Sequence, residues 1–231
     1  RIRLIGSGNR GSVIRGKADG TVTQDADPWG CGANAVRCLA ADNTSICCFQ
    51  NFTFADGHNV GFSADAYGGG VNGGGRDYTF ICDSVFTNCV GNRGAAIYTG
   101  RAVRCRFVDC MDYYCWTRAA ATQSCVFEVL NRPPRDAIIG QDAYAYGCTV
   151  VGRAAANDPL LRADGNNIYN TVGSHGKNTP SGAACGGNTI WEWSGQPNDN
   201  FVKANPAFVD EANGDYRLLS LSEVIGKGTV P

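Results

Sequence analysis

The strongest constraint on the fold is a short pattern that returns about every 21 residues in the middle of the chain. Each copy has a polar residue or Cys, then any residue, then a large apolar residue, and the steps between copies are 21, 20, 23 and 22 residues. The copies are Ser84–Phe86, Cys105–Phe107, Cys125–Phe127, Cys148–Val150 and Asn170–Val172. Units this short cannot each build a core, so neighbouring units must bury one another.

A second apolar series lies eleven residues after the first. Its members are Ile97, Ile138 and Leu161, whereas Arg118 stands at the position that follows Phe107. Short runs of β-branched and aromatic residues separated by Gly, Asn and Asp are typical of strands joined by turns. The two series together predict an all-β fold, a single-stranded, right-handed parallel β-helix solenoid with 20 to 23 residues per coil.

Other repeat folds fit the sequence less well. A leucine-rich repeat has a similar period but requires regularly spaced leucines, which are scarce before the last third of the chain. Amphipathic helical patterns are absent, which argues against helical solenoids and βαβ folds. We therefore expect one domain over residues 1–231, excised or processed from a longer protein, with a less regular capping region at 166–231 that includes Trp191 and Trp193.

Composition excludes several functions. The formal net charge is -1 and the basic residues are scattered, so nucleic acid is not an expected partner. No apolar run approaches the roughly 20 residues of a membrane-spanning helix. Charged residues make up 18% of the chain and glycine accounts for 31 positions, which indicates many tight turns.

Cysteine usage favours an exported protein. The chain has twelve cysteines without the paired C-x-x-C spacing of a structural zinc site. Cys105, Cys125 and Cys148 would lie on successive coils about 4.8 Å apart, which is compatible with disulfides and equally with a column of buried free thiols. Cys31 and Cys38, seven positions apart across a loop, are the better disulfide candidates.

Two stretches carry a family resemblance. The segment 86–98, with Phe86, Asn88 and the run Gly94-Ala95-Ala96-Ile97, resembles the F-x-x-N and G-G-A-I repeats of polymorphic outer-membrane and autotransporter adhesins. The segment 205–218, from Asn205-Pro206 to Tyr216-Arg217-Leu218, is similar to the closing segment of exported β-helix proteins of Planctomycetes and Verrucomicrobia. The resemblance implies a structural or adhesive segment of an exported bacterial cell-surface protein, with glycans or another surface protein as partners.

The alternative function is a carbohydrate-active β-helix enzyme. A polysaccharide lyase requires a carboxylate cluster for Ca²⁺ and a basic residue, and a glycoside hydrolase requires paired carboxylates. The side chains that could approach one another on adjacent coils are Asp109, Asp112, Arg118, Asp136 and Asp142, and each is a turn residue or solvated charge in the simpler interpretation. His58 and His175 are not brought together by any repeat. We expect no cofactor, with Ca²⁺ only in the case of a lyase.

The candidate ligand-binding residues are aromatic and polar side chains on neighbouring units. Their rings would stack on sugars and their polar groups would bind hydroxyl or carboxylate groups, although core packing of the same rings is the simpler alternative. The residues are Tyr113, Tyr114, Trp116, Arg118, Asp136, Asp142, Tyr144 and Tyr146.

Overall fold

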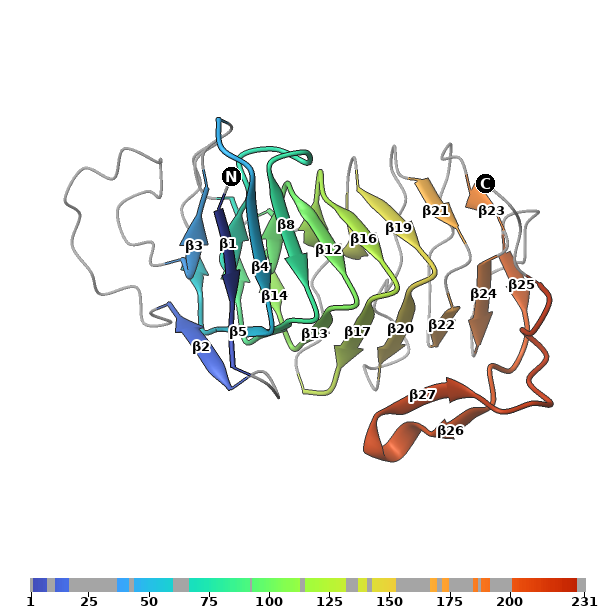
Figure 1. Cartoon of the computed structure of the whole chain (residues 1–231). Helices are drawn as coiled ribbons and strands as arrows, with labels where there is room; N and C mark the ends of the chain where they lie inside the picture. Colours follow the sequence, from blue (N-terminus) through green and yellow to red (C-terminus); the bar gives the residue numbers. More distant parts are fainter. Residues whose placement is uncertain are drawn as a thin grey trace.

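The computed structural model describes most of the chain between its second residue and residue 227. The described ranges are 2–7, 11–16, 37–41, 44–59, 67–91, 93–112, 115–131, 137–140, 143–152, 167–169, 172–174, 185–186, 188–191 and 201–227. Within them the protein is all-β, with four parallel sheets and one antiparallel pair (Figure 1).

Strands that follow one another along the chain belong to different sheets. Sheet A consists of β1 (Ile2–Ile5), β4 (Cys47–Gln50), β8 (Thr79–Cys82), β12 (Arg101–Val103), β16 (Ala121–Gln123), β19 (Tyr144–Tyr146), β21 (Asn167–Tyr169) and β23 (Cys185–Gly186). Sheet B consists of β2 (Ser12–Arg15), β5 (Phe52–Ala55), β9 (Val85–Thr87), β13 (Arg106–Val108), β17 (Val126–Val129), β20 (Thr149–Gly152), β22 (Val172–Ser174), β24 (Asn188–Trp191) and β25 (Phe201–Lys203). Sheet C consists of β6 (His58–Asn59), β10 (Val90–Gly91) and β14 (Met111–Asp112). Sheet D consists of β3 (Leu39–Ala40), β7 (Val71–Asn72), β11 (Ile97–Tyr98), β15 (Cys115–Arg118) and β18 (Ala137–Ile139).

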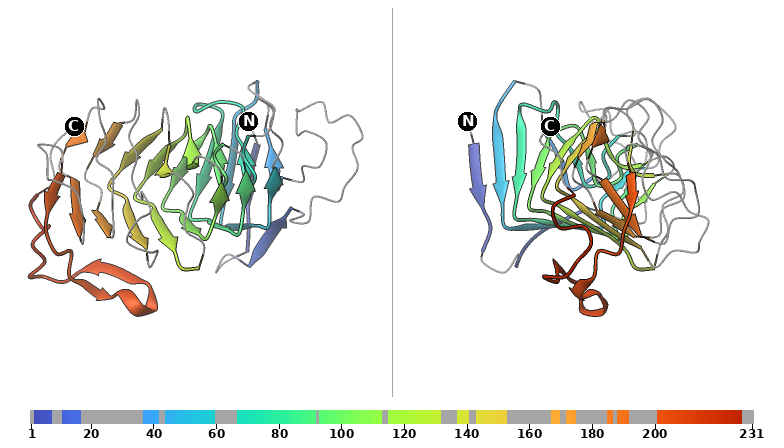
Figure 2. Two further views of the ribbon diagram at one scale, coloured as in Figure 1. Left: turned by 180° about the vertical axis from the view of Figure 1, so that it is seen from behind. Right: turned by 90° about the vertical axis from the view of Figure 1, so that its right-hand side faces the viewer.

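The chain visits the sheets in a fixed order. From β8 to β11 it passes through sheets A, B, C and D, and β12 returns to sheet A beside β8. The next circuit, from β12 to β15, repeats this order, and β16 again returns to sheet A. The strands of successive circuits pair in parallel, as the view along the stack in Figure 2 shows. This arrangement is compatible with a parallel β-helix.

The first apolar series forms the predicted internal stack. Phe86, Phe107, Phe127 and Val150 are register partners on successive strands of sheet B, and all four are fully buried. The ring centroids of Phe86 and Phe107 are 4.8 Å apart, and those of Phe107 and Phe127 are 4.5 Å apart. Phe54 extends the stack at 4.9 Å from Phe86. The prediction of one continuous aromatic column is confirmed.

The second apolar series is only partly correct. Ile97 pairs with Thr117, and Thr117 pairs with Ile139, so Ile139 rather than Ile138 continues this column. Leu161 lies outside the described residues. The error arises because the connection between sheets B and D changes length from one circuit to the next, which a fixed spacing of eleven residues does not allow.

A single left-handed residue turns the chain from five strands of sheet A, namely β4, β8, β12, β16 and β19, toward sheet B. We call this set of positions the first corner, and its members are Asn51, Asp83, Arg104, Ser124 and Gly147. Each directly follows a strand of sheet A and has a φ between 50° and 63°. Asn, Asp and Gly tolerate this conformation, whereas Arg and Ser adopt it at an energetic cost. A second corner after sheet B has the same geometry at Asp56, Asn88 and Asp109.

The interior cysteines form a column beside the aromatic stack. Cys105, Cys125 and Cys148 are buried free thiols, as the thiol-column alternative predicts. Their Sγ atoms donate to backbone carbonyl groups of the preceding circuit, at 3.4 Å to Ile81, 3.4 Å to Ala102 and 3.7 Å to Thr122 respectively. Burial raises the pKa of Cys125 and Cys148, so these thiols stay protonated.

The described parts of residues 166–231 contain both regular strands and a hairpin. Strands β21 to β25 continue sheets A and B, so regular pairing persists over part of the stretch expected to be irregular. An antiparallel hairpin follows, formed by β26 (Phe208–Asp210), a 3₁₀ turn at Glu211–Asn213, and β27 (Asp215–Leu218). Figure 1 shows this hairpin below sheet B, turned back toward β17.

Candidate functional site

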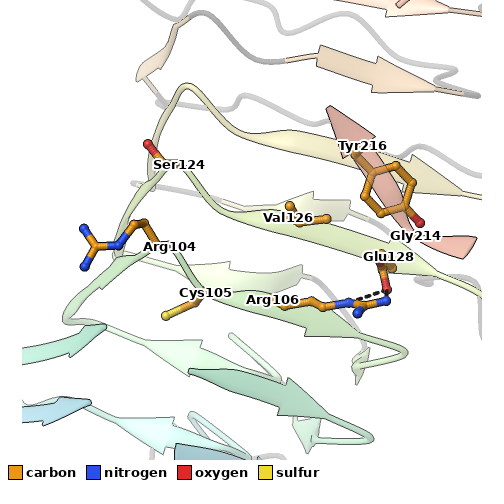
Figure 3. A pocket seen from close by; sticks show the side chains of 8 residues that line it. All are labelled: Arg104, Cys105, Arg106, Ser124, Val126, Glu128, Gly214 and Tyr216. Atoms are coloured by element: carbon orange, nitrogen blue, oxygen red, sulfur yellow. Dashed lines mark hydrogen bonds and ion pairs between the residues drawn. The ribbon is translucent and has the colours of Figure 1, made fainter. Parts of the chain in front are cut away.

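A groove between the outer face of sheet B and the C-terminal hairpin is the candidate site (Figure 3). Its volume is about 250 Å³, and it opens to solvent. The lining residues are Arg104, Cys105, Arg106, Ser124, Val126, Glu128, Gly214 and Tyr216. Side chains alternate between the two faces of a strand, so the buried rings of Phe107 and Phe127 fix the outward direction of Arg106, Val126 and Glu128.

An ion pair forms one side of the groove. Nε and Nη2 of Arg106 donate to Oε2 of Glu128 at 2.8 and 2.6 Å. The Glu128 side chain is fully buried although it lies on the outer face of the sheet, while 41% of the Arg106 side chain is exposed. Oε1 of Glu128 is buried and has no hydrogen-bond partner within the described part of the chain. Arg106 is therefore held in place by a carboxylate that solvent does not reach.

The hairpin covers this ion pair. Gly214 has a φ of 77°, and a Cβ at this position would lie 3.2 Å from Nη2 of Arg106 and 3.7 Å from Oε1 of Glu128. A side chain at residue 214 would therefore be strained in its backbone and crowded against the guanidinium. Partial burial raises the pKa of Tyr216 to about 12, and the charge of Glu128 adds to the shift.

A second arginine stands at the other end of the groove. Nε and Nη2 of Arg104 donate to the two carboxylate oxygens of Asp83 at 2.7 and 2.8 Å. Asp83 also accepts a hydrogen bond from Nε2 of Gln50 at 3.1 Å, so Gln50 and Arg104 share its carboxylate. The Asp83 contact raises the pKa of Arg104, which keeps the guanidinium charged.

The two arginines keep one donor nitrogen each. Among the described residues, the hydrogen bonds of Arg104 and Arg106 come from Nε and Nη2, and Nη1 of each side chain has no protein partner. The hydroxyl groups of Ser124 and Tyr216 and the apolar side chain of Val126 complete the groove. Such a surface can bind a carboxylate through the arginines and hydroxyl groups through Ser124 and Tyr216.

Four of the eight predicted ligand-binding residues lie in the described part of the chain. The Trp116 side chain is fully buried in the core, so the expectation that its ring faces solvent is wrong. Arg118 lies on β15 of sheet D, whereas Tyr144 and Tyr146 lie on β19 of sheet A with 42% and 39% of their surface exposed. The other four predicted residues, Tyr113, Tyr114, Asp136 and Asp142, lie outside the described ranges.

Tyr144 and Tyr146 share the outer face of sheet A, since the buried Ala145 between them faces the core. The guanidinium of Arg76 lies 4.3 Å from the centroid of the Tyr144 ring. This cation–π contact covers part of the Tyr144 ring, whereas the Tyr146 side chain is exposed to solvent. The two tyrosines therefore remain a second candidate surface, on a different sheet from the groove.

Asp109, one of the carboxylates considered for an enzyme, has a structural role. Oδ1 of Asp109 accepts from the backbone N–H groups of Leu130 and Asn131 at 2.7 and 3.0 Å, and Oδ2 accepts from Nδ2 of Asn131 at 2.8 Å. Asp109 thus stabilises a turn, as the simpler interpretation predicts. The described ranges contain no group of three or more His, Cys, Asp or Glu side chains arranged to hold a metal ion.

The disulfide prediction is not realised at Cys38. This residue is a free thiol whose Sγ donates to the carbonyl oxygen of Ala55 at 3.2 Å, and Cys31 lies outside the described residues. Ten cysteines of the described ranges are free.

Comparison with known proteins gives no relative. No protein-family model, curated protein or solved structure matches the chain. In the described ranges no helix is long and apolar enough to cross a membrane.

Sequence reasoning missed Arg106, Glu128 and Tyr216. The repeat placed Phe107 and Phe127 correctly, and its period of two within each strand assigns Arg106 and Glu128 to the outer face. The charged residue directly beside each core Phe could have indicated an ion pair on the outer face of the sheet. Nothing in the repeat indicated that the segment around Tyr216 would fold back onto this face.

Proposed function

We propose that this chain is a structural or adhesive segment of an exported bacterial surface protein, and that it binds an acidic saccharide in the groove beneath the C-terminal hairpin. The proposed fold of the chain is a single-stranded, right-handed parallel β-helix. Register partners Phe86, Phe107, Phe127 and Val150 are separated by 21, 20 and 23 residues, in agreement with the predicted coil length. Right-handed connection is the general preference of parallel strands within one sheet.

One observation carries the ligand assignment. Arg104 and Arg106 are each fixed by a carboxylate through two nitrogens and each keep Nη1 unpartnered within the described residues, on the same groove. Side chains fixed before binding lose little conformational entropy when the ligand arrives. A sugar carboxylate would accept from Arg104 or from Arg106, whose guanidinium groups lie at opposite ends of the groove in Figure 3, and ring hydroxyl groups would bind Ser124 and Tyr216.

The groove supports binding better than hydrolysis. Hydrolysis uses two carboxyl groups that flank the scissile bond. Among the described residues, Glu128 is the single carboxylate that lines the groove, and its Oε2 already accepts hydrogen bonds from Arg106. The proposal of an exported location is supported by the resemblance of the segments 86–98 and 205–218 to exported β-helix proteins.

A glycan array of acidic and neutral saccharides tests the ligand assignment. The full chain should bind members that contain a uronic acid, and the double variant Arg106→Leu/Glu128→Leu should lose this binding. This pair of substitutions removes both charges together, so no carboxylate is left buried alone. Circular dichroism of both proteins establishes that the variant is folded.

The matched control is Tyr144→Ala/Tyr146→Ala on sheet A, which should bind as the parent does. Loss of binding in this control, with binding kept in the groove variant, would move the ligand to the tyrosine surface. Binding of neutral glycans alone would contradict the role of the arginines. If the parent binds no glycan, the saccharide assignment is wrong and the structural role stands without it.

A further inference from the structure

The exposed aliphatic side chains of the described residues gather in two places, the first circuit and the C-terminal segment 204–227. Those of the first circuit lie on β1 and β2 and are Ile2, Leu4, Ile5 and Val13. Those of the C-terminal segment are Val209, Leu218, Leu219, Leu221 and Ile225. Between these two regions, Leu130 is the single exposed aliphatic side chain of the described ranges. Apolar groups that gather on a surface mark interaction sites.

The first circuit forms an open end of the stacked sheets. Within the described part of the chain, β1 pairs with β4 alone and β2 pairs with β5 alone, so each strand has one free edge. Leu4 is the register partner of the buried Phe49 and continues its column, yet 46% of Leu4 is exposed. A free edge with apolar side chains in line with the core is a surface that favours association with another chain.

The C-terminal segment lies at the opposite end. Asn205 follows β25, the last described strand of sheet B, and its N–H donates to Oε2 of Glu223 at 2.9 Å. The N–H of Leu219 donates to the carbonyl oxygen of Ala207 at 2.9 Å. These contacts hold the residues after the hairpin beside β25. Figure 1 shows β1 and β2 at one end of the molecule and β25 with the residues that follow it at the other.

The two ends carry opposite charge. Residues 1–16 contain four arginines and no acidic residue, and two of these arginines, Arg3 and Arg15, lie exposed on β1 and β2. Residues 204–227 contain four acidic residues and two basic ones, and Glu211 and Glu223 are exposed. Like ends of two copies therefore repel each other, whereas opposite ends attract. The formal net charge of -1 adds little general repulsion between copies.

We propose that two copies of this chain bind head to tail, with the N-terminal end of one copy on the C-terminal segment of the other. Leu219, Leu221 and Ile225 of one copy would cover Ile2, Leu4 and Ile5 of the next. The contact uses two different patches, so every assembly keeps one free end of each kind and continues to grow. This self-association goes beyond the proposed function and does not involve the groove.

Two double variants of the full chain test the contact by sedimentation equilibrium. The parent should show a mass that rises with protein concentration without reaching a plateau. Ile2→Thr/Ile5→Thr removes apolar groups from the N-terminal end, and Leu221→Ser/Ile225→Ser removes them from the C-terminal segment. Each variant alone should associate at least about 10-fold more weakly than the parent, because the contact buries less apolar surface. The substituted side chains are exposed, and circular dichroism checks that both variants are folded.

An equimolar mixture of the two variants distinguishes opposite ends from like ends. Each variant keeps one intact patch, and the two intact patches are complementary, so the mixture should form dimers that do not grow further. A mixture that associates no better than its components would overturn the proposal. Association of the Ile2→Thr/Ile5→Thr variant with parental affinity would also overturn it, since the contact would then not use the N-terminal end.

Leu130→Ser is the matched control, because it removes an exposed aliphatic side chain between the two ends. This variant should associate as the parent does. Equal weakening in Leu130→Ser and in the two double variants would contradict a contact confined to the ends. A parent that stays monomeric at every concentration would overturn the proposal and exclude a second copy of this chain as the partner of these surfaces.

Discussion

Arg106 and Glu128 occupy diagonal positions on neighbouring strands and form an ion pair, with both donated hydrogen bonds converging on Oε2 of the carboxylate. The carboxylate is fully buried because the hairpin residues Gly214 and Tyr216 cover it. The ion pair therefore links the body of parallel sheets to the C-terminal hairpin.

Arg106→Ala should destabilise the protein by about 3 kcal/mol, because it leaves the Glu128 carboxylate buried without a partner. Urea unfolding measures the loss as a lower midpoint. The double variant Arg106→Leu/Glu128→Leu should recover most of it, since both charges are then absent. If the single and double variants are equally destabilised, the loss comes from packing rather than from the unpaired charge.

Tyr216 should make the protein less stable in alkali. Its pKa is raised to about 12 in the folded state from an ordinary value near 10, so the folded chain holds the phenol proton more tightly than the unfolded chain. The stabilisation is complete below about pH 10 and is lost as the pH rises from about 10 to 12. Denaturant midpoints measured against pH should show this fall in the parent.

The control for this titration is Tyr216→Phe, which keeps the ring and removes the phenol. The difference in tyrosinate absorbance between parent and variant isolates one group among the nine tyrosines of the chain. A titration of that group near pH 10 would mean that neither burial nor the charge of Glu128 raises the pKa of Tyr216.

Phe107→Ala should cost about 3 to 5 kcal/mol, since it removes a buried ring with stacked rings on both sides. Thermal unfolding of the variant checks this. Phe80→Ala is the matched control, because Phe80 lies on the outer face of sheet A and is only half-buried. Its loss should be clearly smaller, and equal losses would contradict the internal position of the aromatic column.

Ala119→Gly should stabilise the protein slightly, by up to about 1 kcal/mol. Ala119 has a φ of 48°, which costs an L-residue about 1 to 2 kcal/mol, and glycine avoids this while losing roughly 0.5 to 1 kcal/mol in chain entropy. Ala121→Gly, two residues on in a strand, has no such strain to relieve and should be destabilising. Differential scanning calorimetry resolves the two signs, and destabilisation by both would show that residue 119 is unstrained.

The sequence by itself determined the period, the strand content and the aromatic column. A 20- to 23-residue repeat with a large apolar residue at one phase leaves few ways to bury Phe86, Phe107 and Phe127 other than on one another. The residue types at Asn51 and Asp83 suit the left-handed conformation of the first corner, whereas Arg104 and Ser124 adopt the same conformation without such a local signal.

Only the tertiary structure decided which side chains meet on the surface. The ring of Trp116, a candidate for sugar stacking, is buried as the core-packing alternative predicted. Ile139 rather than Ile138 continues the second apolar column, because the connection between sheets B and D changes length from one circuit to the next. The groove depends on the contact of Arg106 and Glu128 with the hairpin residues Gly214 and Tyr216. No periodicity in the sequence specifies this contact. A repeat determines the register of neighbouring circuits through burial, whereas the docking of a non-repeating hairpin depends on individual side chains, here Arg106, Glu128 and Tyr216.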